Sequence, residues 1–112
     1  RGKVVLIDMW NTWCGPCIRA MKSLQPVKKE LKDVVYVYVA DESSPEGKWK
    51  ITIPDIHGIH YRITNKQSSA MGKLYEYPGI PTYFIVDREG NIAYKVTGFP
   101  GADVIKEELN KL

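Results

Sequence analysis

The sequence predicts a single α/β domain in which helices flank a mixed β-sheet. The chain has 112 residues, which is the length of one domain. Residues 3–40 read as strand, helix and strand, an order that joins parallel strands through a right-handed crossover. Residues 83–96 read as two strands around a tight turn, which adds an antiparallel pair. Parallel and antiparallel pairs in one domain make the sheet mixed.

The first strand and helix occupy the first third of the chain. Residues 3–10 are apolar along most of their length, as in a buried strand, but Asp8 interrupts them. Periodicity leaves open whether this carboxyl lies at an exposed strand end or is buried. Residues 15–32 form the expected first helix, with Pro16 in its first turn and Pro26 placed to kink or divide it. The expected apolar face of this helix consists of Ile18, Met21, Leu24, Val27 and Leu31.

The middle of the chain carries weaker signals. Residues 34–40 are a second buried strand. Ser44 resembles a helix cap and is followed by proline, which predicts a short helix to about residue 53. Residues 59–63 are expected to form a short edge strand, and Asn65 is expected to cap a further helix that ends near residue 75.

The last third predicts a hairpin and a closing helix. Residues 83–87 and 92–96 are the expected antiparallel strands, and residues 88–91 are their turn. Residues 102–111 form the expected last helix. Its inward residues are predicted to be Val104, Ile105, Leu109 and Leu112.

Composition and charge exclude several classes of protein. No apolar run approaches the ~20 residues of a membrane span. The net charge of +3 is too small to indicate a nucleic-acid partner, and the lysines of the first helix (Lys22, Lys28, Lys29 and Lys32) read as a solvated face. The chain opens directly on a strand without a signal peptide. We therefore expect residues 1–112 to be a single-domain fragment of a longer precursor.

Cys14 and Cys17 are the only two cysteines, and their spacing favours redox chemistry. A structural staple that closes so small a ring would contribute only about 2 kcal/mol. A metal site would need further ligands, and His57 and His60 are separated from the cysteines by far more than zinc-finger spacing. At a helix start, unpaired backbone N–H groups and the helix dipole favour a thiolate, which is the reactive form. We therefore expect Cys14 to be a nucleophile, and no metal.

The motif Trp13-Cys14-Gly15-Pro16-Cys17 after a strand, with Gly79-Ile80-Pro81-Thr82 before another, resembles the thioredoxin-like superfamily. Asp8, Trp10 and Gly98 also occur in the family's order. The 40 positions from Asp41 to Pro81 exceed what thioredoxin uses there, which is similar to the extracytoplasmic TlpA/ResA type. The resemblance implies a thioredoxin-like fold with an insertion before the strand that follows a cis-proline.

The resemblance also implies roles for the residues around the cysteine motif. Cys14 would attack a substrate disulfide and Cys17 would resolve the mixed disulfide. Trp13, Gly15 and Pro16 would flank the bound substrate. Spacing alone favours an ordinary trans proline at position 81, whereas the family places a cis-proline there, opposite the cysteines. The Ile80 backbone would then pair with a substrate strand.

Four further positions match the family less closely. Asp8 would be buried, with a raised pKa, and would exchange a proton with Cys17. Residues 35–39 lack the lysine that thioredoxin sets near its aspartate, so the environment of Asp8 is expected to differ. Glu42 matches an active-site glutamate of some TlpA/ResA members, or else it is an exposed strand-end carboxylate. Gly98 and Phe99 would form a wall of the substrate groove, although Phe99 fits packing against the last helix equally well.

The implied activity is reduction of protein disulfides through a Cys14/Cys17 cycle, without a bound cofactor. Gly15-Pro16 between the cysteines is similar to reducing members. The TlpA/ResA type further implies a periplasmic or membrane-tethered monomer that takes electrons from a membrane thiol transporter and serves cytochrome c maturation proteins. The alternatives are a non-catalytic binding module, an oxidant or isomerase, and a peroxidase, which lacks its upstream cysteine here.

Overall fold

The structure is a computed structural model that describes residues 2–112. It contains five strands, four α-helices and one 3₁₀ helix within this range. In chain order they are β1 (Val5–Met9), α1 (Gly15–Glu30), β2 (Val35–Asp41), α2 (Glu46–Thr52), η1 (Ile53–Asp55), β3 (Ile59–Ile63), α3 (Asn65–Leu74), β4 (Thr82–Val86), β5 (Ile92–Thr97) and α4 (Ala102–Asn110).

The strands form one mixed sheet in the order β3-β2-β1-β4-β5. Strands β1, β2 and β3 are parallel, whereas β4 runs antiparallel to both β1 and β5. This confirms the mixed sheet, the hairpin and the edge position of residues 59–63. The segment between β2 and β4 holds α2, η1, β3 and α3, as expected for an insertion before β4.

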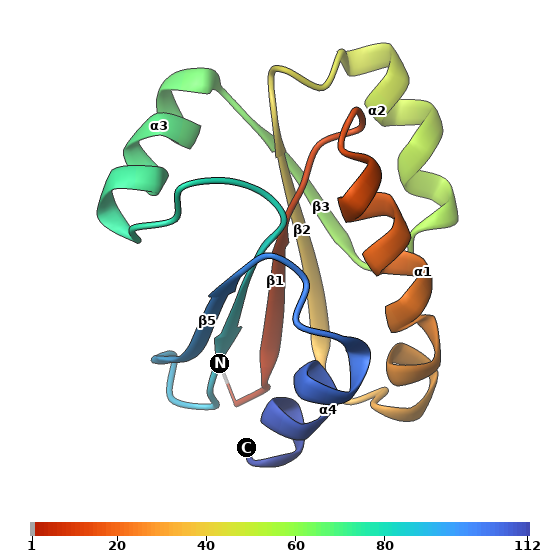
Figure 1. Cartoon of the computed structure of the whole chain (residues 1–112), viewed down its shortest axis with the longest axis vertical. Helices are drawn as coiled ribbons and strands as arrows, with labels where there is room; N and C mark the ends of the chain where they lie inside the picture. Colours follow the sequence, from red (N-terminus) through yellow and green to blue (C-terminus); the bar gives the residue numbers. More distant parts are fainter. Residues whose placement is uncertain (1) are drawn as a thin grey trace.

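Helices cover both faces of the sheet (Figure 1). Side chains alternate along β1, so Leu6, Asp8 and Trp10 point to the face covered by α1, while Met9 points to the opposite face. The first face buries Leu6 against Leu24 of α1 and against residues of α4. The opposite face packs Met9, Val39 and Phe84 against α3 and the loop after it. Asp8 is therefore directed toward α1 by strand alternation alone.

Two details of the helices differ from the sequence-based predictions. α1 continues unbroken through Pro26. In α4, Ile105 and Leu109 are buried as predicted, but Val104 and Leu112 are exposed. Val104 directly precedes Ile105 and therefore lies off the inward stripe of the helix, and Leu112 falls beyond the last residue of α4.

The two predicted helix caps are wrong by one residue. Thr64, not Asn65, caps α3, and it forms a reciprocal capping box with Gln67. Pro45, not Ser44, precedes α2, and no side chain caps that helix. The Ser44 hydroxyl is instead bonded to Asn11 and Thr12, on the loop that leads to the cysteines. In the described part of the chain, every helix is too short or too polar to cross a lipid bilayer.

Candidate active site

The two cysteines lie where β1 passes into α1. Cys14 is the N-cap residue of α1, and its sulfur is joined to Cys17 by a disulfide with a Cα–Cα distance of 5.3 Å. The backbone N–H of Cys17 also donates to Cys14 Sγ at 3.2 Å. An N–H aimed at this sulfur, together with the positive end of the helix, favours the thiolate once the disulfide is reduced. The predicted position of the pair at a helix start is confirmed.

Cys14 is the more accessible of two buried cysteines. It is 4% exposed, while Cys17 is 0% exposed. The residues around it, Trp13, Gly15 and Pro16, are all exposed. The sulfur of Cys14 is thus the outer one of the pair. It lies below the exposed residues Trp13, Gly15 and Pro16, which form a frame around it, and a substrate must pass between them to reach it.

Asp8 is buried on the α1 side of the sheet, which decides between the two alternatives left open by the sequence. Its side chain is 2% exposed, and it stands in register between Tyr38 of β2 and Tyr83 of β4. Tyr38 packs in the same cluster as Cys17, so Asp8 borders the cluster that holds the disulfide. Burial raises the pKa of Asp8 to about 8, against the opposing effect of the Lys28 ammonium. A carboxyl with this pKa can gain or lose a proton near neutral pH.

The cation whose charge acts on the Asp8 carboxyl comes from α1 and not from β2. Lys28 is half-buried, and burial lowers its pKa while the charge of Asp8 raises it. The prediction that Lys28 belongs to a solvated face is therefore wrong. The spacing held a signal, because Lys28 follows Met21 by seven residues and so falls on the same helical face as Met21 and Cys17.

The segment opposite the cysteines begins with a cis peptide bond between Ile80 and Pro81, as the resemblance implied. Ile80 packs against the cluster that contains both cysteines. The N–H of Gly98 donates to the carbonyl of Pro81 at 2.8 Å, which places Gly98 beside the proline. Phe99 packs against the core under α4, with its ring 6.0 Å from that of Tyr83, so its packing role is the one that the structure shows.

A polar network holds the loop before Cys14. The Oδ1 atom of Asn11 accepts from the Asp41 N–H at 3.0 Å and from the Ser44 hydroxyl at 2.8 Å. Ser44 Oγ in turn accepts from the Thr12 N–H at 2.9 Å. Asn11 and Ser44 are both buried, so these bonds replace water that the loop cannot reach. Sequence analysis missed this network, because it joins loops that are far apart in the chain.

The same β2 loop fixes the exposed tryptophan beside the cysteines. The indole Nε1 of Trp13 donates to Ser43 Oγ at 2.8 Å, and Ser43 donates to Asp41 through both its N–H and its hydroxyl. Burial disfavours ionisation of Asp41, but hydrogen bonds from Ser43 and Ser68 outweigh it and lower its pKa. The ring of Trp13, 62% exposed, is therefore held in place although no core surrounds it.

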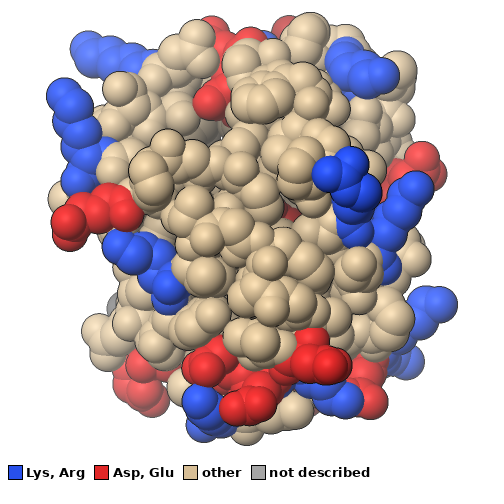
Figure 2. Space-filling model, in the orientation of Figure 1, with Lys and Arg blue, Asp and Glu red and all other residues tan. Residues whose placement is uncertain are grey.

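Charged side chains surround a broad uncharged area in one view of the molecule. Figure 2 shows basic side chains on both sides of this face and acidic ones gathered mainly at its lower end, where Figure 1 places α4, with further acidic side chains at the top.

The sequence and the fold of this chain both match known proteins. The family described as thioredoxin-like matches residues 2–92. The chain belongs to the thioredoxin-like family. It is 27% identical over 116 residues to the thiol-disulfide oxidoreductase ResA of Geobacillus kaustophilus, covering all of this chain and 64% of that protein. It is 29% identical over 98 residues to the thiol:disulfide interchange protein DsbE of Haemophilus influenzae, covering 88% of this chain and 52% of that protein. The chain thus spans about two thirds or less of these relatives.

Solved structures share the thioredoxin-like fold along the whole chain. A thiol-disulfide isomerase from Corynebacterium glutamicum superposes with a TM-score of 0.85 at 21% identity, covering 100% of this chain and 81% of that one. The thioredoxin domain of a thiol-disulfide oxidoreductase from Bacteroides vulgatus gives a TM-score of 0.80 at 23% identity, covering 97% and 81%. The Cys14–Cys17 disulfide accordingly lies within a thioredoxin-like fold.

The remaining predicted site residue lies at the edge of this thioredoxin-like site. Glu42 is exposed, and its Oε1 accepts a hydrogen bond from the Asn65 N–H at 2.8 Å. The carboxylate therefore sits at the N-terminus of α3, where it complements the helix dipole. This contact agrees with an exposed carboxylate after β2, and a catalytic role for Glu42 stays a prediction.

The two histidines make contacts of other kinds. His60 stacks on Tyr38 with ring centroids 5.0 Å apart, and its Nε2 lies 2.7 Å from the Ile56 carbonyl. His57 is exposed, and its carbonyl accepts from Lys28. Within residues 2–112, no three His, Cys, Asp or Glu side chains gather as a metal site would require.

Proposed function

We propose that this domain is a thiol-disulfide oxidoreductase that reduces protein disulfides through Cys14 and Cys17. The observation that carries the proposal is the Cys14–Cys17 disulfide at the first turn of α1, with the protonatable Asp8 buried next to the cluster that holds it. The names of the ResA and DsbE relatives support it.

The proposed cycle starts from the reduced pair. The Cys14 thiolate attacks one sulfur of a substrate disulfide, so a Cys14–substrate bond forms and the other substrate sulfur leaves as a thiolate. Cys17 then gives its proton to the Asp8 carboxylate. The Cys17 thiolate attacks Cys14 Sγ, which closes the Cys14–Cys17 disulfide and releases the second substrate thiolate with its electron pair. Two electrons thus pass from the domain to the substrate.

The substrate would enter the frame around Cys14. Trp13, Gly15 and Pro16 would flank it on the cysteine side, since all three are exposed next to the outer sulfur. The backbone of Ile80, held by Pro81, would pair with an extended substrate segment from the opposite side. Gly98 would border this groove through its bond to Pro81. Phe99 would support the groove from beneath, by its contact with Tyr83.

The direction of electron transfer and the cellular compartment are proposed by analogy with the relatives. Gly15-Pro16 between the cysteines is similar to reducing members, so we propose a reductant that needs no bound cofactor. The setting proposed is extracytoplasmic, with the domain tethered to a membrane through a further segment, electrons supplied by a membrane thiol transporter, and cytochrome c maturation proteins among the substrates. A structural neighbour with a TM-score of 0.77 at 18% identity is described as a secreted disulfide oxidoreductase from Mycobacterium tuberculosis. We expect the domain to act as a monomer.

Reduction of insulin by dithiothreitol, with and without the domain, tests the activity. The wild-type domain should accelerate precipitation of the insulin B chain, whereas Cys14→Ser should not. Cys17→Ala should accumulate a covalent complex with the substrate, visible by mass spectrometry, because its mixed disulfide cannot be resolved. No acceleration by the wild type would sink the proposal and favour a binding module.

Equilibration with a series of glutathione ratios tests the direction. A potential close to that of thioredoxin, about −270 mV, indicates a reductant, and one close to about −120 mV indicates an oxidant. Alkylation of the reduced Cys14 over a range of pH adds an independent check. A thiol that ionises near the free value of about 8.5 would count against an activated nucleophile.

A further inference from the structure

Asp8 has no hydrogen-bond partner for either carboxyl oxygen among the residues that the structure describes. The titratable groups that act on it are Lys28 from α1, Tyr38 from β2 and Tyr83 from β4. Cys17 from α1 packs in the same cluster as Tyr38. Both tyrosines are buried, and burial raises their pKa values, so they stay neutral in this range. Lys28 is thus the cation that the fold directs toward the carboxyl.

The ammonium of Lys28 is fixed at the end of the Tyr38 side chain. Its Nζ donates to the Tyr38 hydroxyl at 2.7 Å and to the His57 carbonyl at 2.6 Å, and it lies 4.9 Å from the centroid of the Tyr38 ring. Tyr38 is in turn the direct neighbour of Asp8 across the β1–β2 pair, on the same face of the sheet. Two bonds that converge on one nitrogen give it a defined place, which a solvated lysine lacks.

The conformation of the loop before β3 brings the His57 carbonyl within hydrogen-bond distance of Lys28 Nζ. Gly58 has φ +153°, and a Cβ there would stand 2.6 Å from the Tyr38 ring and 2.7 Å from the Tyr36 carbonyl. Only glycine therefore lets this loop close over Tyr38 and bring the His57 carbonyl to Lys28.

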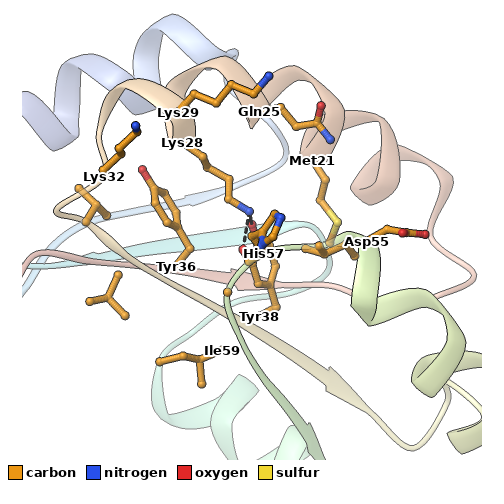
Figure 3. Close-up of a pocket in the computed structure, with 14 residues that line it drawn as sticks. Met21, Gln25, Lys28, Lys29, Lys32, Tyr36, Tyr38, Asp55, His57 and Ile59 are labelled. Carbon is orange, nitrogen blue, oxygen red and sulfur yellow. Dashed lines mark hydrogen bonds between the residues drawn. The ribbon is translucent and has the colours of Figure 1, made fainter.

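Lys28 also lines an open cavity. The cavity of about 440 Å³ lies between the second half of α1, β2 and the loop before β3, and Lys28 is one of the residues that line it. Figure 3 shows Lys28 reaching from α1 to Tyr38 and His57, whereas Lys29 and Lys32 extend away from them. The ammonium is therefore half in contact with solvent and half turned to the buried side of the site.

We propose that Lys28 is a positioning residue for the proton step, and that its fixed charge keeps enough Asp8 ionised at neutral pH to accept the proton of Cys17. The proposal rests on the function proposed above. The proton moves from Cys17 Sγ to an Asp8 oxygen, and the Cys17 thiolate then forms the bond to Cys14 that expels the substrate thiolate. Lys28 takes no part in bond making.

Removal of the charge has a defined consequence for Asp8. Without the nearby cation, burial acts alone and the carboxyl stays protonated to a higher pH. A rise of about one pH unit, at the low end of what a nearby opposite charge produces, makes the ionised form about tenfold rarer at pH 7. Resolution of the mixed disulfide should slow by the same factor at that pH.

The test compares the wild type with Lys28→Met, Lys28→Gln and Lys28→Arg. Lys28→Gln keeps a donor toward Tyr38 and His57, so it supplies a neutral folded protein if Lys28→Met unfolds. Lys29→Met is the matched control, because Lys29 lines the same cavity but is exposed. The first measurement is a carboxyl carbon NMR titration of Asp8 in the oxidised domain, where neither cysteine titrates, with the Asp8→Asn spectrum as assignment. The second is the rate of mixed-disulfide resolution against pH.

We expect both neutral variants to move the Asp8 midpoint and the rate profile upward by about one pH unit. Lys28→Arg and Lys29→Met should match the wild type. An Asp8 midpoint that stays at the wild-type value in both neutral variants overturns the proposal. A shift of equal size in Lys28→Arg overturns it as well, since packing and not charge would then be the cause. A wild type that fails to reduce insulin removes the proposed function, while the NMR titration still decides whether Lys28 controls Asp8.

Discussion

The Ser44 hydroxyl donates to Asn11 Oδ1 at 2.8 Å across 33 residues of sequence, with both side chains buried. This bond fastens the loop that follows β2 to the loop that carries Cys14. Asn11 Oδ1 also accepts the Asp41 N–H, so a single oxygen satisfies two donors that water cannot reach. The loop that leads into α1 is therefore held in place by hydrogen bonds as well as by packing.

Asn11→Ala should lower the free energy of unfolding by about 1–3 kcal/mol, because the Ser44 hydroxyl and the Asp41 N–H would both lose their acceptor in a buried place. Urea unfolding of the oxidised domain measures this difference. Ser23→Ala is the matched control, since Ser23 is exposed and bonds only to the carbonyl one turn before it. The control should stay within about 0.5 kcal/mol of the wild type. Equal effects of the two substitutions would contradict the importance of the network.

Trp13→Ala should weaken reaction with protein substrates and leave both stability and small-molecule reactivity unchanged. The ring is 62% exposed, so its loss uncovers little core, but it borders the sulfur that a substrate must reach. We expect kcat/KM for insulin to fall about tenfold, the effect of losing roughly 1.4 kcal/mol of contact. The rate with a small aromatic disulfide reagent should not change.

Ile51→Ala supplies the comparison for Trp13. Ile51 is an apolar side chain on α2 that is 72% exposed, and it was not assigned to the groove. Its replacement should leave both substrates unaffected. If Trp13→Ala slowed the small reagent as much as insulin, the tryptophan would act on the reactivity of Cys14 and not on substrate docking.

The parts of the fold that are local in sequence were predicted well. Alternation and apolar runs located all five strands, and the Cys14–Cys17 motif located the start of α1. Helix caps were less reliable, because Ser44 and Asn65 both have the side chain of a cap residue. Only the tertiary bond to Asn11 shows that Ser44 is used elsewhere.

The electrostatics of the site were beyond what the sequence could show. Asp8 was recognised as important through the family, but its partner was sought on β2, where the strand carries Tyr38. The cation comes instead from Lys28 on α1, at a position that the composition of the helix assigned to solvent. A single sequence does not reveal which of several neighbouring lysines turns inward, since that depends on the crossing of the helix over the sheet.

The N-cap of α3 can be tested by comparing substitutions of two neighbouring residues, Thr64 and Asn65. Thr64 Oγ1 accepts from the Gln67 N–H at 3.0 Å, and Gln67 returns a bond to the Thr64 N–H at 2.8 Å. Thr64→Ala should therefore lower the free energy of unfolding by about 1 kcal/mol. Asn65→Ala should change it by less than about 0.5 kcal/mol. The reverse order in chemical denaturation would restore Asn65 as the cap.

The buried Asp8 should make the oxidised domain less stable as pH rises from about 4 to about 8. The folded state keeps this carboxyl protonated up to a pKa of about 8, whereas in the unfolded chain it ionises at the ordinary pKa of an aspartate, 3.8. Between those limits the folded state binds one proton more than the unfolded state, so the free energy of unfolding falls by up to about 1.4 kcal/mol for each pH unit.

Asp8→Asn should flatten this slope and raise stability at pH 7. Urea unfolding at several pH values measures it, with the exposed Asp55→Asn as the control that keeps the wild-type slope. Parallel curves for the wild type and Asp8→Asn would mean that the carboxyl is already ionised in the folded protein, which its burial between Tyr38 and Tyr83 argues against.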